Sequence, residues 1–160
     1  SAFWPIGEEI DVRPAMEALH ARGAALALPT VAGRDKPLVF RRYRPGDPLV
    51  PAGFGTSEPA PDAPAVTPTV LLVPLLAFTR AGARLGYGGG FYDRTIAAIA
   101  AASGRAPRTI GVGYDAQEVA RLPLEIHDEP LGALLTESGL RPADAPAGDA
   151  RDQRDPPPCD

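Results

Sequence analysis

Ten residues near the middle of the chain carry the clearest chemical signal, the segment Arg84-Leu-Gly-Tyr-Gly-Gly-Gly-Phe-Tyr-Asp93. Four of the five residues from 86 to 90 are glycine, which reaches positive φ and lets a ligand approach backbone N–H groups. A helix is predicted to begin directly afterwards, and the first N–H groups of a helix attract anions. Arg84 adds a planar guanidinium that suits phosphate oxygens. The segment predicts a phosphate site, with a tight turn that binds nothing as the alternative.

Three aromatic residues, Tyr87, Phe91 and Tyr92, surround these glycines in a chain with only ten aromatic residues. Aromatic faces beside an anion site suit a flat heterocycle that is joined to, or lies next to, phosphates. The alternative is that Phe91 and Tyr92 are core residues on one helix face. The segment lacks the Gly-Lys-Ser/Thr of a P-loop and the acidic residue about 20 positions on that completes a dinucleotide fingerprint, so neither motif is predicted.

Strand and helix patterns alternate around this segment. Helices are predicted after the N-cap Asp11, ending at Gly23, then over Tyr92–Ala102 and Ala116–Arg121. Strands are predicted at Ala2–Pro5, Ala24–Leu28, Leu38–Tyr43, Val70–Val73, Arg108–Gly113 and Ala133–Thr136. This order predicts a three-layer α/β/α fold with a mostly parallel, Rossmann-like central sheet. Ligands of such sheets bind beyond the carboxyl ends of the strands.

The chain of 160 residues is predicted to form one domain over residues 1–140 and a disordered tail over 141–160. The tail is rich in Pro, Asp and Arg and has no Leu, Ile, Val or Phe. A second proline cluster, with seven prolines from Pro45 to Pro68, predicts a long and partly extended loop, because proline cannot donate to a strand ladder. We expect this loop to be the one that closes over a ligand.

Composition excludes several classes of function. The net charge of −4, from 16 basic and 20 acidic residues, argues against a protein that coats nucleic acid. One cysteine, Cys159, and two histidines cannot build a disulfide or a metal site of soft ligands. No apolar run approaches the roughly 18–20 residues of a membrane span, and no signal peptide is visible. We therefore expect a cytoplasmic protein that binds neither nucleic acid nor membrane.

With these features in view, the glycine-rich segment and the preceding Val73-Pro-Leu-Leu-Ala-Phe78 resemble the signature of the 5-formyltetrahydrofolate cyclo-ligase (methenyltetrahydrofolate synthetase) family. The resemblance extends in order over about 135 residues. Its other blocks are Trp4-Pro-Ile-Gly-Glu-Glu-Ile-Asp11, Gly46-Asp47, Ser57-Glu58-Pro59, Leu122-Pro-Leu-Glu-Ile-His-Asp128 and Thr136-Glu137. The glycine block alone would only be suggestive, whereas the ordered set is specific.

The resemblance implies a ligase of one-carbon folate metabolism that requires ATP and Mg²⁺. Such an enzyme converts 5-formyltetrahydrofolate to 5,10-methenyltetrahydrofolate and releases ADP and phosphate. The formyl oxygen is a poor leaving group, so transfer of the γ-phosphoryl group to it gives an imidoyl phosphate that N10 of the folate attacks. This transfer needs positioning and charge neutralisation more than a protein nucleophile, and the sequence shows no Ser–His–Asp set.

The resemblance also assigns roles to residues. For ATP it implies Arg84, Leu85, Gly86, Tyr87, Gly88, Gly89, Gly90, Phe91 and Tyr92, with Arg84 and Tyr92 as catalytic residues. For the folate it implies Trp4, Glu9, Tyr87, Gly88, Gly89, Gly90 and Phe91. The Glu9 carboxylate would accept two N–H bonds from the pyrimidine edge. For Mg²⁺, a cation that prefers oxygen ligands, it implies Asp93 and Asp128.

Alternative roles remain open for some of these residues. Asp93 could cap its own helix, and Glu9, close to Glu8 and Asp11, could belong to a solvated acidic turn. His127 is expected to be a hydrogen-bonded structural residue. The family pattern also has an N-terminal helix whose Lys and Arg contact ATP, whereas this sequence begins inside the first predicted strand.

The Lys and Arg of that N-terminal helix are not present in this sequence, and this suggests an alternative function. Loss of one charge-assisted contact costs about 1.5–3 kcal/mol, or about 10- to 150-fold in ATP affinity. The alternative is therefore a nucleotide- or folate-binding module without turnover. A third interpretation is a protein that binds partners through its proline-rich loop and tail. For the enzyme we expect a monomer that takes 5-formyltetrahydrofolate, with or without a polyglutamate chain.

Overall fold

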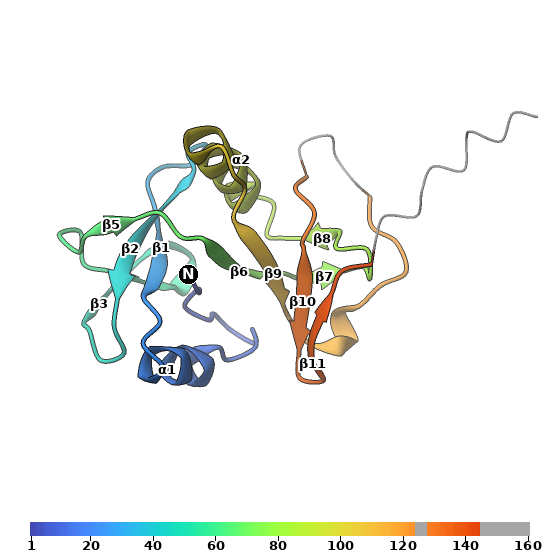
Figure 1. The fold of residues 1–160 in the computed structure, drawn as a ribbon, viewed down its shortest axis with the longest axis horizontal. Helices are drawn as coiled ribbons and strands as arrows, with labels where there is room; N and C mark the ends of the chain where they lie inside the picture. Colours follow the sequence, from blue (N-terminus) through green and yellow to red (C-terminus); the bar gives the residue numbers. More distant parts are fainter. Residues whose placement is uncertain (124–127, 145–160) are drawn as a thin grey trace, which may run out of the picture.

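The computed structural model describes residues 1–123 and 128–144, which form a mixed α/β protein (Figure 1). In this described part the α-helices are α1 (Arg13–Ala21) and α2 (Phe91–Ser103), and 3₁₀ turns lie at Gly53–Gly55 (η1) and Asp115–Gln117 (η2). The strands are β1 (Leu26–Val31), β2 (Leu38–Tyr43), β3 (Leu49–Pro51), β4 (Ser57–Pro59), β5 (Ala65–Val66), β6 (Val70–Pro74), β7 (Ala77–Phe78), β8 (Arg84–Leu85), β9 (Arg108–Val112), β10 (Ala133–Thr136) and β11 (Gly139–Pro142). None of the described helices is both long and apolar enough to cross a membrane.

The largest sheet has the strand order β11-β10-β9-β6, and β6, β9 and β10 run parallel. β6 is apolar, and its residues Leu71, Leu72 and Val73 are buried, as expected for a strand that is covered on both faces. α2 lies in the connection from β6 to β9, because a parallel pair needs a long crossover. At the carboxyl ends of these two strands Pro74 lies beside Val112, so the segments that follow them leave the sheet at the same edge.

The first residues of the chain connect this sheet to the antiparallel sheet β1-β2-β5. The N–H group of Ala2 donates to the Ala27 carbonyl at 3.0 Å, and the N–H group of Leu72 donates to the Ser1 carbonyl at 3.1 Å. Figure 1 shows the N-terminal segment between β1 and β6. The strand predicted at Ala2–Pro5 is not formed. Ser1 and Ala2 nevertheless lie between the two sheets and bond to a strand of each.

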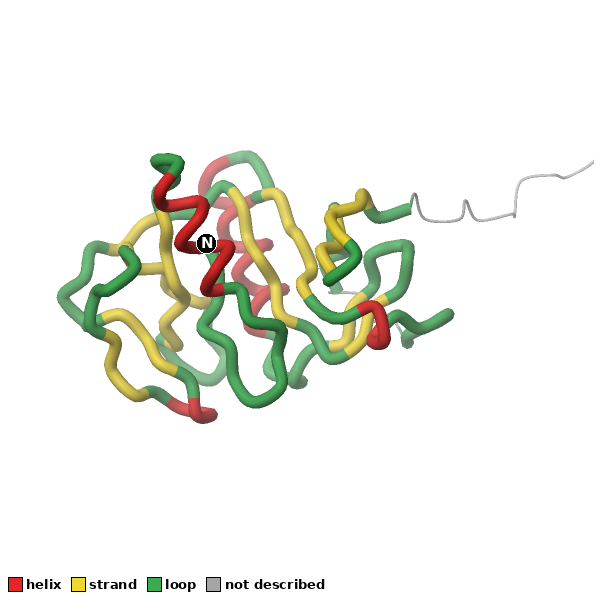
Figure 2. Tube along the Cα trace, turned by 90° about the horizontal axis from the view of Figure 1, so that it is seen from below, coloured by secondary structure: helices red, strands yellow, loops and turns green. Residues whose placement is uncertain are grey.

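Two buried clusters form the core, and each contains residues of one helix. Met16 of α1 shares a cluster with Leu72 of β6, whereas Ile96 of α2 shares the other with Leu71 and Val73. This division follows from the alternation of side chains between the two faces of a strand. Figure 2 shows α1 in front of the strands and α2 behind them. The helix that follows the glycine turn is thus fixed to the central strands by its apolar face.

The predicted mixed α/β class is confirmed, but a mostly parallel, Rossmann-like sheet is not. Among the strand pairs of the described residues only β6–β9 and β9–β10 are parallel, and β1–β2, β2–β5, β3–β4, β7–β8 and β10–β11 are antiparallel. A parallel pair needs a crossover, usually a helix. The described part of the connection from β9 to β10 contains only the turn η2, so the repeated strand–helix units of a Rossmann fold are not present there.

The first predicted helix is nearly correct at both ends. It begins at Arg13 with Val12 at the N-cap position, so Asp11 is not the N-cap as predicted. The Asp11 carboxylate instead accepts the Arg13 N–H at 3.0 Å and forms an ion pair with the Arg13 guanidinium. Gly23, at φ +87°, donates its N–H to the His20 carbonyl and closes the helix as predicted.

Three further expectations differ from the structure. The loop predicted over Pro45–Pro68 contains the hairpin β3–β4 and the edge strand β5. Pro51 and Pro59 lie in the two-stranded hairpin, where both strands are edges and proline is tolerated. The helix predicted at 116–121 is reduced to η2. The predicted tail begins too early, because Arg141 and Pro142 belong to β11, which pairs with β10. The rest of that tail, from residue 145 on, lies outside the described residues.

Candidate active site

The glycine-rich segment forms the predicted turn before a helix. β8 pairs with β7 in a short hairpin, and α2 begins at Phe91 after the turn. The strand before the turn, β8, has only two residues, and its Leu85 is exposed. Gly88 and Gly90 have φ values of +79° and +59°, a region that favours glycine. Among the described residues no side chain caps the first N–H groups of α2, so these donors are available to a ligand or water.

Arg94, which sequence analysis did not single out, fixes this turn from the first turns of α2. Its guanidinium Nη2 donates to the carbonyl of Gly89 at 2.5 Å and to that of Arg34 at 3.1 Å. The guanidinium carbon also lies 5.3 Å from the centre of the Phe91 ring. The glycine turn is therefore tied both to its own helix and to the connection between β1 and β2.

Arg84 is held by protein groups at the start of the same segment. Its Nη2 donates to Oδ1 of Asp93 and its Nη1 to the carbonyl of Glu129, each at 2.5 Å. The Arg84 side chain is only 7% exposed, and Asp93 Oδ1 also accepts the Glu129 N–H at 3.0 Å. The open alternative for Asp93, a cap of its own helix, is not what the structure shows, because the carboxylate pairs with Arg84. This ion pair joins the turn to the segment that follows Asp128.

Glu9 and Tyr87, both predicted to bind substrate, meet in a cleft of about 740 Å³. The Tyr87 hydroxyl donates to Oε1 of Glu9 at 3.0 Å, and Oε2 of Glu9 accepts the Ile6 N–H at 2.9 Å. Burial, followed by the hydrogen bond to the carboxylate, raises the pKa of Tyr87, so this phenol stays a donor. The cleft is lined by Gly7, Glu8, Glu9, Leu75, Leu76, Tyr87, Tyr114 and Gln117.

The cleft lies where ligands of parallel sheets are expected. Leu75 follows the carboxyl end of β6, and Tyr114 follows the carboxyl end of β9. The turn that carries Glu9 and the glycine turn that carries Tyr87 complete its wall. Four segments that are far apart in the sequence therefore meet at one sheet edge.

The other predicted aromatic contacts are placed differently. Trp4 packs edge-on against Tyr43, with the ring centres 6.2 Å apart, and Arg13 lies 5.6 Å from its ring. Tyr92 packs against the core cluster on the α2 side. Burial raises the pKa of Tyr92, and the charge of Glu9 raises it further while Arg84 opposes this. Neither Trp4 nor Tyr92 lines the cleft with Glu9, so their substrate and catalytic roles stay predictions.

The described residues contain no group of three or more His, Cys, Asp and Glu side chains that could hold a metal by themselves. Magnesium does not require such a group, because it commonly takes one or two carboxylates together with substrate phosphates and water. Asp93 lies in the first turn of α2, directly after the glycine turn. The role of Asp93 and Asp128 as magnesium ligands therefore stays a prediction, and His127 lies outside the described residues.

Two lining residues of the cleft were not predicted from the sequence: Tyr114, directly before η2, and Gln117, the last residue of η2. Gln117 Nε2 donates to the carbonyls of Leu75 and Leu76, at 3.0 and 3.1 Å, and its Oε1 accepts the Tyr114 N–H at 2.6 Å. A polar and an aromatic residue directly after a buried strand, in a Tyr-x-x-Gln spacing, are the signal that could have indicated them.

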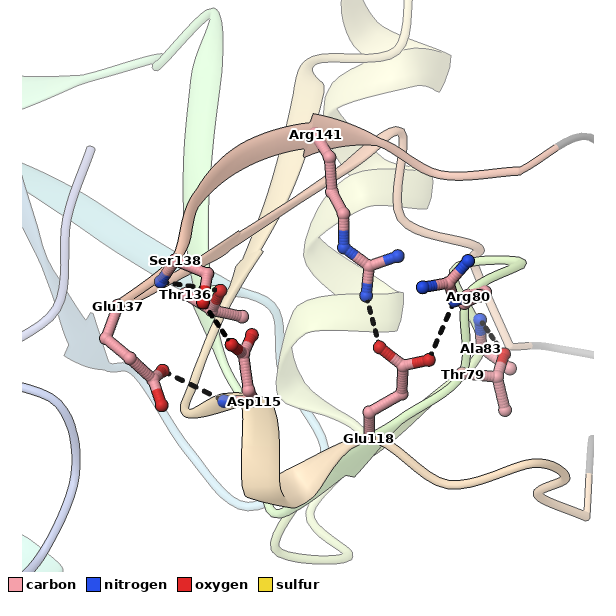
Figure 3. Close-up of polar contacts among 9 residues, drawn as sticks. All are labelled: Thr79, Arg80, Ala83, Asp115, Glu118, Thr136, Glu137, Ser138 and Arg141. Atoms are coloured by element: carbon pink, nitrogen blue, oxygen red, sulfur yellow. Dashed lines mark hydrogen bonds and ion pairs between the residues drawn. The ribbon is translucent and has the colours of Figure 1, made fainter.

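A second polar network fixes the outer side of η2 to the hairpin β10–β11 (Figure 3). The Ser138 hydroxyl donates to the Asp115 carboxylate, and the Asp115 N–H donates to Oε2 of Glu137 at 2.9 Å. Glu118 pairs with both Arg80 and Arg141, at 3.0 and 2.5 Å. The segment that carries Tyr114 and Gln117 is therefore held on both sides.

The comparisons with known proteins agree with the resemblance. A model of the 5-formyltetrahydrofolate cyclo-ligase family matches residues 1–137. A 5-formyltetrahydrofolate cyclo-ligase of Mycolicibacterium smegmatis is 41% identical over 143 residues, which cover 84% of this chain and 71% of that protein. The Escherichia coli K12 protein of the same name is 38% identical over 148 residues, which cover 86% and 77%.

Two solved structures are similar over most of the chain. The NMR structure of a 5,10-methenyltetrahydrofolate synthetase from Aquifex aeolicus has a TM-score of 0.69 and 29% identity, and covers 96% of this chain and 76% of that one. A 5,10-methenyltetrahydrofolate synthetase from Mycoplasma pneumoniae has a TM-score of 0.61 and 22% identity, and covers 83% and 70%. The second likeness concerns the fold alone.

Proposed function

Because the chain belongs to the 5-formyltetrahydrofolate cyclo-ligase family, we propose that it closes 5-formyltetrahydrofolate to 5,10-methenyltetrahydrofolate in a reaction that requires ATP and Mg²⁺. The observation that carries this proposal is the meeting of Glu9 and Tyr87 in one cleft, with Tyr87 supplied by the glycine turn. The Glu9 carboxylate, which would bind a heterocycle, therefore lies beside the glycine turn, whose N–H donors would bind phosphates.

The folate end of the site is proposed to lie at Glu9. The half-buried carboxylate is already oriented by the Ile6 N–H and the Tyr87 hydroxyl. An ionised carboxylate has about four acceptor positions, so it can also accept N–H groups from the pyrimidine edge of a pterin. Tyr87, which is 59% exposed, presents its ring to the same cleft. These two residues together would bind and orient the substrate.

The phosphate end is proposed to lie at the glycine turn and the first N–H groups of α2. Two observations support this: no side chain of the described residues caps α2, and Gly88 and Gly90 have positive φ values. Arg84 adds positive charge close by, although both of its terminal nitrogens already bind protein groups. Its contribution would therefore combine charge with the positioning of the turn.

The proposed reaction transfers the γ-phosphoryl group of ATP to the formyl oxygen of the folate. The folate N10 then forms a bond to the formyl carbon and loses its proton, while the bond from that carbon to the phosphorylated oxygen breaks and phosphate leaves. No protein nucleophile is needed, because the substrate supplies the attacking nitrogen. The chain contributes orientation of the two substrates, main-chain donors for charge, and a cleft that limits access of water.

A magnesium ion bound with ATP would neutralise phosphate charge during this transfer. The carboxylate of Asp93 is an oxygen donor of the type that Mg²⁺ prefers, and it lies one helical turn from the glycine turn. We propose Asp93 and Asp128 as its protein ligands, with phosphate oxygens and water completing the set.

The test is formation of the methenyl product, followed by its absorbance. The chain is incubated with 5-formyltetrahydrofolate and Mg·ATP, and parallel samples omit ATP or replace Mg²⁺ with a chelator. We expect product and an equal amount of ADP only in the complete mixture. Binding of both substrates, detected by thermal-shift titration, without any product would instead identify a binding module and overturn the proposal.

A further inference from the structure

Tyr114 is an aromatic residue whose side chain does not pack in the core. It belongs to neither buried cluster, and it is 40% exposed. Large apolar side chains are normally exposed singly, yet Leu76, Tyr87 and Tyr114 are all exposed in the same cleft. Glu9, the carboxylate proposed to accept the pyrimidine edge, lines that cleft as well. An exposed aromatic face beside a group that binds a heterocycle indicates a surface for the ring itself.

The backbone of Tyr114 is held more firmly than that of an ordinary loop residue. Gln117 uses both amide donors on the carbonyls of Leu75 and Leu76, and its oxygen accepts the Tyr114 N–H. The preceding residue leaves no free space, because a Cβ at Gly113 would lie 2.6 Å from Gln117 Oε1 and 2.7 Å from Leu75 Cδ1. Tyr114 is therefore fixed relative to the segment after β6, which forms the adjoining wall of the cleft.

We propose that Tyr114 is a specificity-determining residue for the folate substrate, whose pterin ring packs against the Tyr114 ring while Glu9 holds its pyrimidine edge. Gln117 is the positioning residue that holds Tyr114 in this place. The inference rests on the proposed function, because it assigns a second contact for the same substrate. A fixed aromatic face adds binding energy without the entropic cost of ordering a mobile loop.

The experiment compares steady-state constants of Tyr114 variants. Tyr114→Ala is expected to raise the KM for 5-formyltetrahydrofolate about tenfold, since a lost aromatic contact and its buried area are worth about 1.5 kcal/mol. Its KM for ATP is expected to stay within about twofold, and so is its kcat. Tyr114→Phe keeps the ring and should keep the KM for folate. Leu140→Ala removes an exposed apolar side chain from β11, outside the cleft, and is the matched control.

The positioning role of Gln117 is tested by a double-mutant cycle. Gln117→Ala is expected to raise the KM for folate, and Gln117→Glu should not restore it, because a carboxylate cannot donate to the Leu75 and Leu76 carbonyls. If Gln117 acts through Tyr114, the double variant should have the same KM as Tyr114→Ala alone. Additive effects would contradict the positioning role, because a general loss of stability would not depend on residue 114.

Three outcomes overturn the inference, and they differ from failure of the proposed function. If the wild type is active and Tyr114→Ala has the same KM for folate, the proposed contact between Tyr114 and the pterin ring does not exist. If Tyr114→Ala raises the KM for ATP instead, the Tyr114 ring contacts the nucleotide. If Leu140→Ala raises the KM for folate as much as Tyr114→Ala does, the effect comes from the loss of any exposed apolar side chain. If Tyr114→Ala does not fold, Tyr114→Leu and Tyr114→Trp give the same comparison. If the wild type forms no product, the proposed function fails, and the folate dissociation constant of each variant still decides the contact.

Discussion

Glu9 is the residue at which the proposed substrate contact can be tested most selectively. Glu9→Gln keeps the shape of the side chain but removes its charge and half of its acceptor capacity. A lost charge-assisted contact is worth about 1.5–3 kcal/mol, so the KM for 5-formyltetrahydrofolate is expected to rise about 10- to 150-fold. The control is Glu8→Gln, which changes an exposed residue of the same cleft lining and should have little effect. Equal effects of the two variants, measured in the product assay, would contradict the role of Glu9.

Arg84 combines a positive charge close to the proposed phosphate site with a structural ion pair. Arg84→Met is expected to lower the free energy of unfolding by about 3 kcal/mol, because it leaves the partly buried Asp93 carboxylate without its cation. The double variant with Asp93→Asn should recover part of this loss, since the uncompensated charge is then removed. Urea unfolding measures both. The contrary result is an additive loss, in which the free energy of unfolding of the double variant falls by the sum of the two single losses. The two residues would then act independently.

The resemblance to the family predicted part of the site. Glu9 and Tyr87 were expected at the folate end, and the structure joins them by a hydrogen bond. Tyr114 was missed because it falls between the predicted strand Arg108–Gly113 and the predicted helix Ala116–Arg121. Gln117 was assigned to that helix, and the helical pattern gave its side chain no binding role. The ion pair of Arg84 with Asp93 was also missed. The two residues are nine positions apart in the sequence, and the course of the glycine turn brings them together.

The hairpin β7–β8 presents the glycine turn, and its own turn depends on Gly82. This residue has a φ of +84°, and a Cβ would lie 2.4 Å from the Leu131 carbonyl oxygen. Gly104 has a similar φ of +69°, but a Cβ there meets nothing within 4 Å. Gly104→Ala is therefore expected to lose about 1 kcal/mol of stability from backbone strain alone. Gly82→Ala should lose about 2–4 kcal/mol, because a backbone clash is added. Equal losses in thermal unfolding would contradict this packing.

Asp115 anchors η2 to the hairpin β10–β11, and this anchor should depend on pH. Hydrogen bonds from Ser138 and Thr136 hold the pKa of Asp115 below its ordinary value of 3.8. A carboxyl group of this kind stabilises the fold above its unfolded-state pKa, and the contribution is lost as the pH falls through the folded-state pKa. Asp115→Asn should thus be less stable than the wild type at pH 7, with a difference that shrinks as the pH is lowered below 3.8.

Urea unfolding at a series of pH values measures this difference. Asp62→Asn, which removes an exposed carboxylate in the turn before β5, is the matched control for the loss of one surface charge. If Asp115→Asn kept the same stability difference at pH 7 and at pH 3, its carboxylate would not be the ionisable anchor of η2.

At the level of elements, strands and helices with strong local patterns were predicted well. β2 and β10 have the predicted bounds, and β6 extends one residue further, to Pro74. The short helix at 116–121 was wrong, because Gln117 and Glu118 use their side chains on neighbouring segments. The proline-rich stretch was expected to be a long, partly extended loop, yet Pro51 and Pro59 lie in the short paired strands β3 and β4. A two-stranded ribbon has only edge strands, where a missing N–H group is tolerated.

The fold as a whole was predicted only in its class. Alternation of strands and helices indicates a parallel sheet, but pairing partners are set by contacts between distant segments, which local patterns do not record. The N-terminal residues, for example, bond to both β1 and β6. The general rule that ligands bind at carboxyl ends of parallel strands did locate the cleft, since β6 and β9 both end there.

The fate of the formyl oxygen tests the central claim, which is that this cleft couples phosphoryl transfer to ring closure. The chain is supplied with Mg·ATP and 5-formyltetrahydrofolate that carries ¹⁸O in its formyl group, and the released phosphate is analysed by mass spectrometry. We predict one ¹⁸O atom in phosphate for each molecule of methenyl product formed. Methenyl product accompanied by unlabelled phosphate, with the label in water, would contradict the account.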